Sequence, residues 1–216
     1  EGDGGASEDE ELYVGVNMSN KFIEENREFL DPDGNGTLDL TGGWHDAGDH
    51  VKFGLPFSYS ASTVGWGYYE FRDAYVATGQ DKHVETIIRY FNDYLMKCTF
   101  RDDSGKVIAH CYQVGDGDID HAYWNSPEID KMARPAFFLT ADKPQTDYVA
   151  SAAACLAINY LNFKDTDPEY AAENLKYAKA LYEFAVETHV EDWEPGMVPT
   201  AKSLGYDGGF YTSSYD

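Results

Sequence analysis

Basic residues are scarce in this 216-residue chain. Lysine and arginine together number 16 against 39 aspartates and glutamates, which gives a net charge of −23 at pH 7. A surface this negative repels nucleic-acid phosphates and anionic lipid headgroups, and no Lys/Arg cluster is dense enough to offset the field locally. We therefore expect neither nucleic acid nor a membrane as a partner, and we expect a neutral or cationic substrate.

Long apolar runs are also missing. No stretch approaches the roughly 20 apolar residues that span a bilayer. The first residues, EGDGGASEDEE, lack the basic start and the apolar run of a secretory signal, so either no signal existed or it has been removed. Their Gly-rich and acidic composition predicts a flexible leader over residues 1–11.

Cysteine is sparse, and its three positions have no metal-ligand spacing. An odd count leaves at least one thiol unpaired within the chain, and buried thiols are the default interpretation of Cys98, Cys111 and Cys155. A Cys98–Cys111 bridge closing a short loop stays open for a secreted protein. Aromatic residues, in contrast, are abundant, with 4 Trp, 17 Tyr and 12 Phe, so we expect some of them to be exposed.

Two kinds of helical pattern alternate along the chain. Residues 57–78 and 147–163 are apolar or small on nearly every side, which predicts buried helices. Residues 81–98 and 168–189 instead carry one apolar stripe and one charged face, which predicts outer helices. An α/α toroid, with an inner ring of helices covered by an outer ring, is expected from this alternation. A bundle with one wholly buried helix is the alternative.

Two further elements are predicted with the same rules. Residues 12–30 suit a helix that ends before the turn-forming run Asp31-Pro32-Asp33-Gly34-Asn35-Gly36. Residues 107–114 (VIAHCYQV) alternate enough for a short strand. The Asp31 run also reads like the start of a calcium loop, but Gly42 stands where such a loop requires a bidentate Glu, which favours a solvated turn.

The stretch GGWHDAGDHVKFGL, residues 42–55, carries the strongest chemical signal. Asp46 and Asp49 lie three residues apart, with Gly48 between them and the first buried helix just downstream. Neighbouring carboxylates shift each other's pKa, so one can act as a base while the other orients a water molecule. The alternative is an Asp-rich turn that caps the next helix.

Two blocks of the sequence resemble glycoside hydrolase family 9, a family of cellulases. The first is GGWHDAGDHVKFGLPFSYSASTVGWGYYEF, and the second is GDGDIDHAYWNSPEIDKMAR followed by Pro135. The resemblance implies an (α/α)6 barrel that hydrolyses β-1,4-glucan with inversion, with Asp49 as general base and Asp46 as its partner in holding water. In inverting enzymes the acid and the base stand roughly 6.5–9.5 Å apart, so the acid must come from elsewhere.

The same resemblance implies residues that line the sugar cleft. His121 and Trp124 match cleft positions, and Phe210 and Tyr211 sit near the family's aromatic pair. His45 stands where the family usually has Tyr or Phe. A Trp face suits the C–H face of a glucosyl ring, and His can bond a hydroxyl. For His121 and Trp124 the alternatives are a polar turn group and a core aromatic.

The family's general acid is a Glu near the end of a catalytic domain about twice this length. No such segment is recognisable, so residues 12–216 resemble the N-terminal half of the barrel, and the C-terminal half is an expected partner. The leading hypothesis is a secreted endo-β-1,4-glucanase acting on a β-glucan. The alternative is a non-catalytic carbohydrate-binding or structural fragment.

No cofactor is expected for the chemistry, whereas structural calcium stays open. Many family members bind calcium after the aromatic pair, where this chain has Thr212, Ser213 and Ser214. The acidic run Asp116, Asp118 and Asp120 is a second candidate for a cation, against the plainer account that these side chains bond their own backbone.

Overall fold

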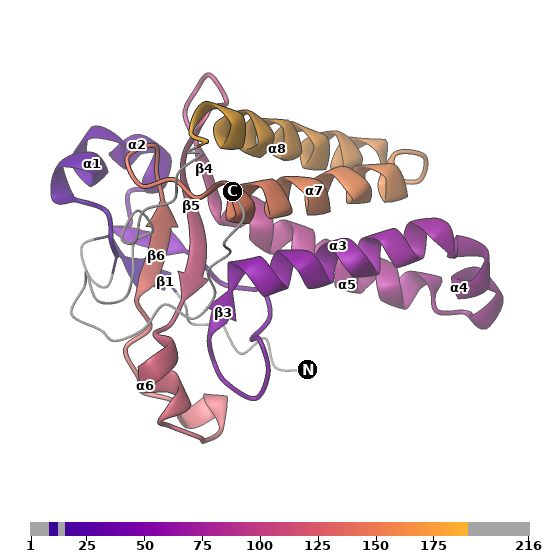
Figure 1. The fold of residues 1–216 in the computed structure, drawn as a ribbon, viewed down its shortest axis with the longest axis horizontal. Helices are drawn as coiled ribbons and strands as arrows, with labels where there is room; N and C mark the ends of the chain where they lie inside the picture. Colours follow the sequence, from indigo (N-terminus) through magenta and orange to yellow (C-terminus); the bar gives the residue numbers. More distant parts are fainter. Residues whose placement is uncertain (1–8, 13–15, 190–216) are drawn as a thin grey trace.

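The computed structural model describes residues 9–12 and 16–189 of the chain (Figure 1). A layered group of long helices lies beside a small sheet, and the N-terminal segments cover the far side of that sheet. The predicted site residues Phe210 and Tyr211, and the calcium candidates Thr212–Ser214, lie outside the described residues.

The long helices form two layers. α7 packs against both α8 and α3, and α5 contacts α3 and α7. α3 and α7 are therefore the inner helices, and α5 and α8 cover them, as the alternating patterns predicted. The elements are α3 (Gly54–Glu70), α4 (Arg72–Thr78), α5 (Asp81–Lys97), α7 (Thr146–Phe163) and α8 (Pro168–Glu187).

Local sequence explains where these helices begin and which face they bury. Asp167 is the N-cap of α8, because its side chain accepts a hydrogen bond from the Tyr170 N–H. Pro168 occupies the first helical position. The stripe predicted for α5 is buried at Val84, Ile88, Phe91 and Leu95. On α8, Ala178 and Ala185 are buried, whereas Tyr182 is 63% exposed.

The single buried helix predicted over residues 57–78 is two helices. α3 ends and α4 begins around Phe71, whose backbone leaves the helical region (φ −116°, ψ 26°). Burial on nearly every side is also wrong here, since Tyr59, Trp66 and Phe71 are each more than half exposed. These exposed side chains lie on a flank of α3 that the described residues leave open.

A four-stranded antiparallel sheet supports the helices at one end. Its central strand is β5 (Val107–Val114), which confirms the predicted strand. β6 (Ala136–Leu139) runs along one edge of β5, because His110 pairs with both Leu139 and Thr99 and Val114 pairs with both Ala136 and Lys52. The opposite edge is shared by β3 (Lys52–Phe53) and β4 (Thr99–Arg101).

The N-terminal segment differs most from its prediction. Only two short helices, α1 (Asn20–Glu25) and α2 (Arg27–Leu30), replace the helix expected over residues 12–30. Val16 bridges to Ala136 of β6, and the Asn17 amide bonds both the N–H and the C=O of Phe138. Contacts 120 residues away in sequence therefore override the local pattern.

The expected leader is also structured at its end. Asp9–Glu11 form β1, which pairs with β2 (Thr37–Asp39). Three residues of the expected leader therefore belong to a strand pair, and residues 1–8 lie outside the described part.

The Asp31 run is a hydrogen-bonded turn, as the missing ligand indicated. Asp31 Oδ2 accepts from the Gly36 N–H, and both Asp33 carboxylate oxygens accept from Asn35. Gly34 and Gly36 both have positive φ, which permits the tight path. The calcium-loop alternative gains no support from these contacts.

The remaining sequence expectations concern thiols and membranes. Cys98, Cys111 and Cys155 are buried free thiols, so the default interpretation is confirmed and the Cys98–Cys111 bridge is not formed. None of the described helices has the length and apolar content needed to cross a bilayer.

Candidate active site

The pairing of β3 with β5 assembles the site. Asp46–His50 form a loop directly before β3, and α6 (Gly117–His121) follows β5. Lys52 pairs with Val114, so the chain just upstream of β3 lies beside the chain just downstream of β5. Two stretches about 70 residues apart in sequence are thereby brought into contact.

The loop holds Asp49 in a defined position. The Asp46 N–H donates to the Val51 C=O at 3.1 Å, which closes the loop. Asp49 is 5% exposed, and its Oδ1 accepts from the Ala47 N–H at 3.0 Å. The second carboxylate oxygen, Asp49 Oδ2, faces the opposite side of the site, where α6 lies. Asp46 itself is exposed at the start of the loop.

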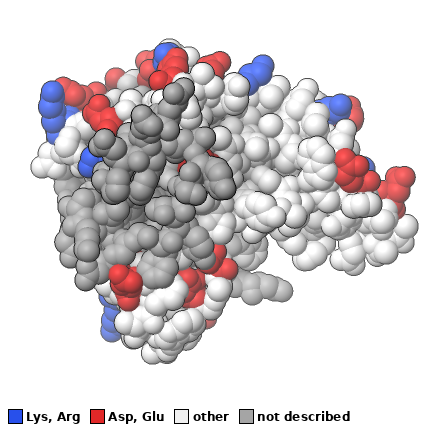
Figure 2. Space-filling view, viewed as in Figure 1, with Lys and Arg blue, Asp and Glu red and all other residues white. Residues whose placement is uncertain are grey.

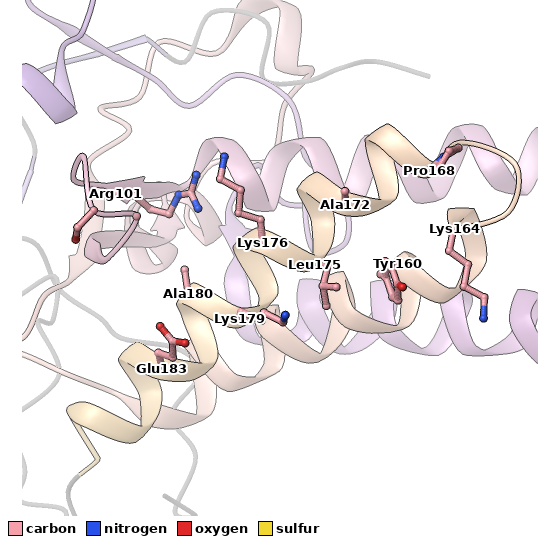
Figure 3. A pocket seen from close by; sticks show the side chains of 12 residues that line it. Arg101, Tyr160, Lys164, Pro168, Ala172, Leu175, Lys176, Lys179, Ala180 and Glu183 are labelled. Atoms are coloured by element: carbon pink, nitrogen blue, oxygen red, sulfur yellow. The ribbon is translucent and has the colours of Figure 1, made fainter.

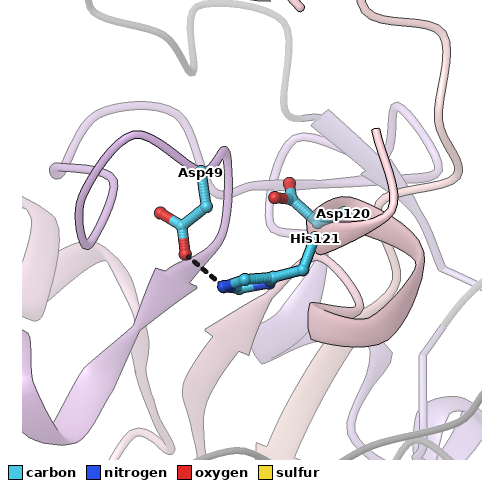
Figure 4. Close-up of side chains that lie close together, drawn as sticks. All are labelled: Asp49, Asp120 and His121. Carbon is cyan, nitrogen blue, oxygen red and sulfur yellow. Dashed lines mark ion pairs between the residues drawn. The ribbon is translucent and has the colours of Figure 1, made fainter. Parts of the chain in front are cut away.

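The short helix α6 places His121 opposite Asp49. Asp116 caps α6 by accepting from the Ile119 N–H at 2.9 Å. His121 Nε2 lies 3.6 Å from Asp49 Oδ2 (Figure 4). The other ring nitrogen, Nδ1, lies 2.6 Å from the Gly117 carbonyl oxygen. Because a carbonyl only accepts, Nδ1 carries the proton and Nε2 of neutral His121 is an acceptor.

Two acceptors therefore face each other across the gap when His121 is neutral. A water molecule that donates to both Asp49 Oδ2 and His121 Nε2 satisfies this arrangement, and a protonated imidazole pairs with the carboxylate directly. With either the neutral or the protonated imidazole, a proton lies close to both Asp49 Oδ2 and His121 Nε2.

Carboxylates of the second sequence block hold His50, the residue after Asp49. Both oxygens of Asp120 accept from the His50 N–H, at 3.1 and 3.0 Å. Asp130 Oδ2 lies 3.0 Å from His50 Nδ1, and the Met132 N–H donates to Asp130 Oδ1 at 2.7 Å. The sequence did not predict that Asp120 and Asp130 hold His50. Asp120 was a candidate only for cation binding, and Asp130 carried no prediction.

The two carboxylates respond differently to their surroundings. Burial raises the pKa of Asp120, the neighbouring Asp49 charge raises it further, and the His50 N–H only partly compensates. Burial also raises the pKa of Asp130, but the Met132 N–H, the His50 ring and the Arg134 charge outweigh it and leave that pKa below its ordinary value. Asp130 therefore stays ionised and holds His50.

Trp124 forms the exposed wall of the site. Its ring is 68% exposed, so the core-aromatic alternative is wrong. The indole N–H donates to the His121 C=O at 2.9 Å, and the two rings meet edge to face with centroids 6.2 Å apart. The ring also lies against the Asp49 loop, because a Cβ added at Gly48 would come within 3.2 Å of it.

His45 lies beside the same loop without entering the Asp49–His121 contact. Its ring is tilted against the His50 ring, with centroids 5.4 Å apart. The structure therefore brings Asp49, His121 and Trp124 to one place, with Asp46 exposed at the start of the same loop and His45 beside His50.

Among the described residues, Asp49, Asp120 and His121 form the one group of three His, Cys, Asp or Glu side chains close enough to share a metal ion. Asp120 already uses both oxygens on the His50 N–H, and Asp49 uses Oδ1 on Ala47. These hydrogen bonds account for the positions of both carboxylates without a metal ion. The predicted trio of Asp116, Asp118 and Asp120 does not converge, because Asp116 caps α6 and Asp118 is exposed.

A separate groove lies along α8 and contains none of the predicted site residues (Figure 3). Its cationic side chains include Arg101, which stacks on Tyr177, and Lys176, which pairs with Glu173. None of the residues that line the groove belongs to either motif block, so we assign the site to the Asp49 loop and α6.

Comparison with known proteins shows the family of the chain. Glycosyl hydrolase family 9 matches residues 6–216. Endoglucanase A of Bacillus pumilus is 46% identical over 147 residues, which are 68% of this chain and 22% of the relative. An endoglucanase of Dictyostelium discoideum is 40% identical over 152 residues, 70% of this chain and 21% of the relative.

Solved structures give the same result. The catalytic domain of CelT from Clostridium thermocellum is 58% identical, with a TM-score of 0.84, and the match covers 94% of this chain and 39% of that one. The C. cellulolyticum cellulase Cel9M, solved with cellobiose, is 36% identical with a TM-score of 0.66 over 81% of this chain and 40% of that one. The chain thus spans well under half of these relatives and part of their barrel. It belongs to glycosyl hydrolase family 9.

Proposed function

We propose that the protein carrying this chain hydrolyses β-1,4-glucosidic bonds in cellulose or a related β-glucan, with inversion at the anomeric carbon. The observation that carries the proposal is the buried Asp49 carboxylate, whose Oδ2 faces His121 beside the exposed ring of Trp124. The matched relatives are endoglucanases, and matched structures hold cellobiose or cellotetraose.

Asp49 acts as the general base in this proposal. A water molecule that donates a hydrogen bond to Asp49 Oδ2 attacks the anomeric carbon as Asp49 takes its proton. The new C–O bond forms on the face opposite the departing sugar, which inverts the configuration. Asp46, whose side chain is exposed at the start of the same loop, is proposed to share in holding the water.

Trp124 supports the sugar ring. An exposed indole face offers apolar contact to the C–H face of a glucosyl unit while hydroxyl groups at the ring edge stay free to bond. The site thus combines a flat apolar wall with a carboxylate, which suits a neutral polysaccharide. Phe210 and Tyr211 remain candidates for a further subsite outside the described residues.

The leaving oxygen needs a proton from a second group. Glu128 is exposed and accepts a hydrogen bond from Ser126. No contact among the described residues directs its carboxylate toward Asp49. We propose that the acid belongs to the C-terminal half of the barrel, the part of the relatives that this chain does not span. Carboxylates and water supply the chemistry, so no cofactor is required, whereas bound calcium would be structural.

The proposal also places the enzyme outside the cell, since a polymeric or insoluble glucan does not enter one. The alternative of a non-catalytic carbohydrate-binding fragment shares the same Trp124 surface. It differs in one measurable respect, because it binds glucan without releasing reducing ends.

Asp49→Asn in the full catalytic domain tests the proposal. The amide oxygen can still accept from the Ala47 N–H, but it cannot take a proton from water, so kcat is expected to fall about 10²- to 10⁴-fold with little change in glucan binding. Asp118→Asn is the control, as it makes the same change at an exposed position of α6. Near-wild-type turnover by Asp49→Asn would remove Asp49 from the role. NMR of the first-formed anomer checks inversion.

A further inference from the structure

The peptide bond that follows Asp49 is held by a residue from another element. The His50 N–H belongs to this peptide, and both oxygens of the buried Asp120 accept from it. Because a peptide unit is planar, fixing this N–H fixes the plane that leaves the Asp49 Cα. Asp120 therefore limits how the Asp49 side chain can be directed.

Consecutive residues of α6 hold consecutive residues of the loop. Asp120 bonds the backbone of His50, and His121 faces the side chain of Asp49 at 3.6 Å (Figure 4). A shift of α6 along the loop would break both contacts together. The distance between Asp49 and His121 is thus determined by the bond between Asp120 and His50.

The ring of His50 is anchored independently. Asp130 Oδ2 accepts from its Nδ1, and Asp130 is in turn fixed by the Met132 N–H and lies 3.9 Å from Arg134. His50 is 6% exposed, so neither its backbone N–H nor its ring has water as an easy replacement partner. Backbone and ring are each held by a carboxylate of the second sequence block.

We propose that Asp120 is a positioning residue for the general base, with Asp130 as its second anchor through the His50 ring. Asp120 acts through the backbone of His50, and it neither contacts the sugar nor transfers a proton. This inference rests on the proposed function for its kinetic consequence, but the anchoring itself is a property of the fold and can be measured without activity.

The test compares Asp120→Ala with Asp120→Asn in the full catalytic domain. Alanine removes the acceptor, whereas asparagine keeps one oxygen to accept from the His50 N–H. Asp118→Ala, on the exposed side of the same helix, is the matched control. Three quantities are measured for each variant: hydrogen exchange of the segment 44–53, kcat on a soluble β-glucan, and KM on the same substrate.

For Asp120→Ala we expect exchange at the His50 amide to be about 10-fold faster or more, because a buried hydrogen bond is lost. We expect kcat to fall about 10- to 100-fold with KM within about threefold, since the base is misplaced while the sugar contacts remain. Asp120→Asn should keep slow exchange and most of kcat, and Asp118→Ala should match the wild type.

Unchanged exchange in a folded Asp120→Ala variant would overturn the proposal, and so would wild-type kcat in that variant. Slow exchange together with a loss of kcat in Asp120→Asn would show that charge, and not anchoring, matters. Faster exchange in a domain whose wild type does not cleave glucan would confirm the anchor and refute the proposed function. If Asp120→Ala does not fold, Asp130→Ala replaces it, and unchanged exchange and kcat there would overturn the proposal.

Discussion

At the scale of single residues, the site depends on a close approach between the Asp49 loop and one aromatic ring. A Cβ at Gly48 would lie 3.2 Å from the Trp124 ring, and the indole N–H bonds the backbone of His121. Trp124 is thus held from two sides even though most of its ring is exposed. The contacts with Gly48 and His121 fix the position of the ring, and its exposed face is available to a ligand.

Trp124→Ala is therefore expected to weaken sugar binding without unfolding the domain. We expect KM on a soluble β-glucan to rise about 10-fold, the scale of one lost stacking contact, with a smaller fall in kcat. Trp124→Phe is the control, because it keeps an aromatic face while it removes the indole N–H and reduces the ring area. A cooperative melt near that of the wild type should accompany the KM change. Loss of that melt would mean that Trp124 supports the fold.

The sequence indicated residue types better than residue roles. Asp49, His121 and Trp124 were predicted from the two motif blocks, and the structure brings them together. The anchoring by Asp120 and Asp130 was not predictable, because it depends on a pairing of β3 with β5 that no local pattern reveals. A spacing shows which carboxylates are present, whereas only the fold shows which N–H groups they meet.

At the scale of elements, two glycines of α3 lie in opposite environments. A Cβ on Gly65 would come within 2.4 Å of Asn159 Oδ1, in a buried set of amides that joins α3, α5 and α7. A Cβ on Gly67 would meet nothing within 4 Å. Gly65 is thus required by packing between the inner helices, and Gly67 is not.

Gly65→Ala is expected to destabilise the protein by about 1–3 kcal/mol, because the amide network must shift to admit the methyl group. Gly67→Ala should leave stability unchanged or raise it by about 0.5–1 kcal/mol, because alanine is the better helix former. Denaturant melts of the two variants measure the difference. Equal effects would show that α3 and α7 do not approach each other at Gly65.

His110 on β5 gives a prediction about pH. It is completely buried, donating to Thr99 Oγ1, whose own hydroxyl donates to Leu95. Burial lowers its pKa from the ordinary 6.5 to about 4. Between these two pH values the unfolded chain binds a proton at this residue and the folded chain does not, so stability falls as pH drops from 6.5 toward 4.

The difference in pKa corresponds to about 3 kcal/mol across that window. His110→Asn keeps a donor for Thr99 and removes the titration, so its free energy of unfolding should change less between pH 6.5 and 4 than that of the wild type. The comparison uses the slope against pH, because the smaller side chain lowers stability at every pH. Parallel slopes would contradict the assignment of a neutral buried His110.

Elements were predictable where local pattern and packing agree. α5 and α8 have one apolar stripe each, and their bounds match the prediction within two residues. The segment 12–30 failed because Val16 and Asn17 bond to β6, an interaction that helical periodicity cannot show. The break at Phe71 between α3 and α4 was missed for a related reason, since a run of small and aromatic residues looks the same on either side of a kink.

At the scale of the whole molecule, the described residues leave a large apolar surface exposed. Figure 2 shows a continuous area over α3 and α7 that lacks Lys, Arg, Asp and Glu side chains. The exposed large side chains of this part of the chain include Tyr59, Trp66 and Tyr69 of α3, and Phe71, which directly follows α3. A second apolar surface lies between α7 and α8, lined by Ala150, Ala153, Ala154, Ala157, Leu175, Ala178 and Tyr182.

An apolar surface of this extent is unusual on a protein that functions alone. Because the match to CelT covers 39% of that chain, we expect the rest of the barrel to cover it. The net charge of −23 works in the same direction, since self-repulsion of the acidic surface opposes compaction while the apolar faces stay uncovered.

Residues 1–216 expressed alone are therefore expected to aggregate or melt without cooperativity, and to release no reducing sugar from a soluble β-glucan. The base would be present without its acid, which forfeits about 10²- to 10⁴-fold in rate, and the unpaired faces of α3 and of α7–α8 would be in water. Adding the complementary half of the catalytic domain in trans should restore both the melt and part of the activity. An Asp49→Asn version of the first half, added in the same way, should restore the melt alone. Robust hydrolysis by the lone chain would place the proton donor within these 216 residues and contradict the half-barrel interpretation.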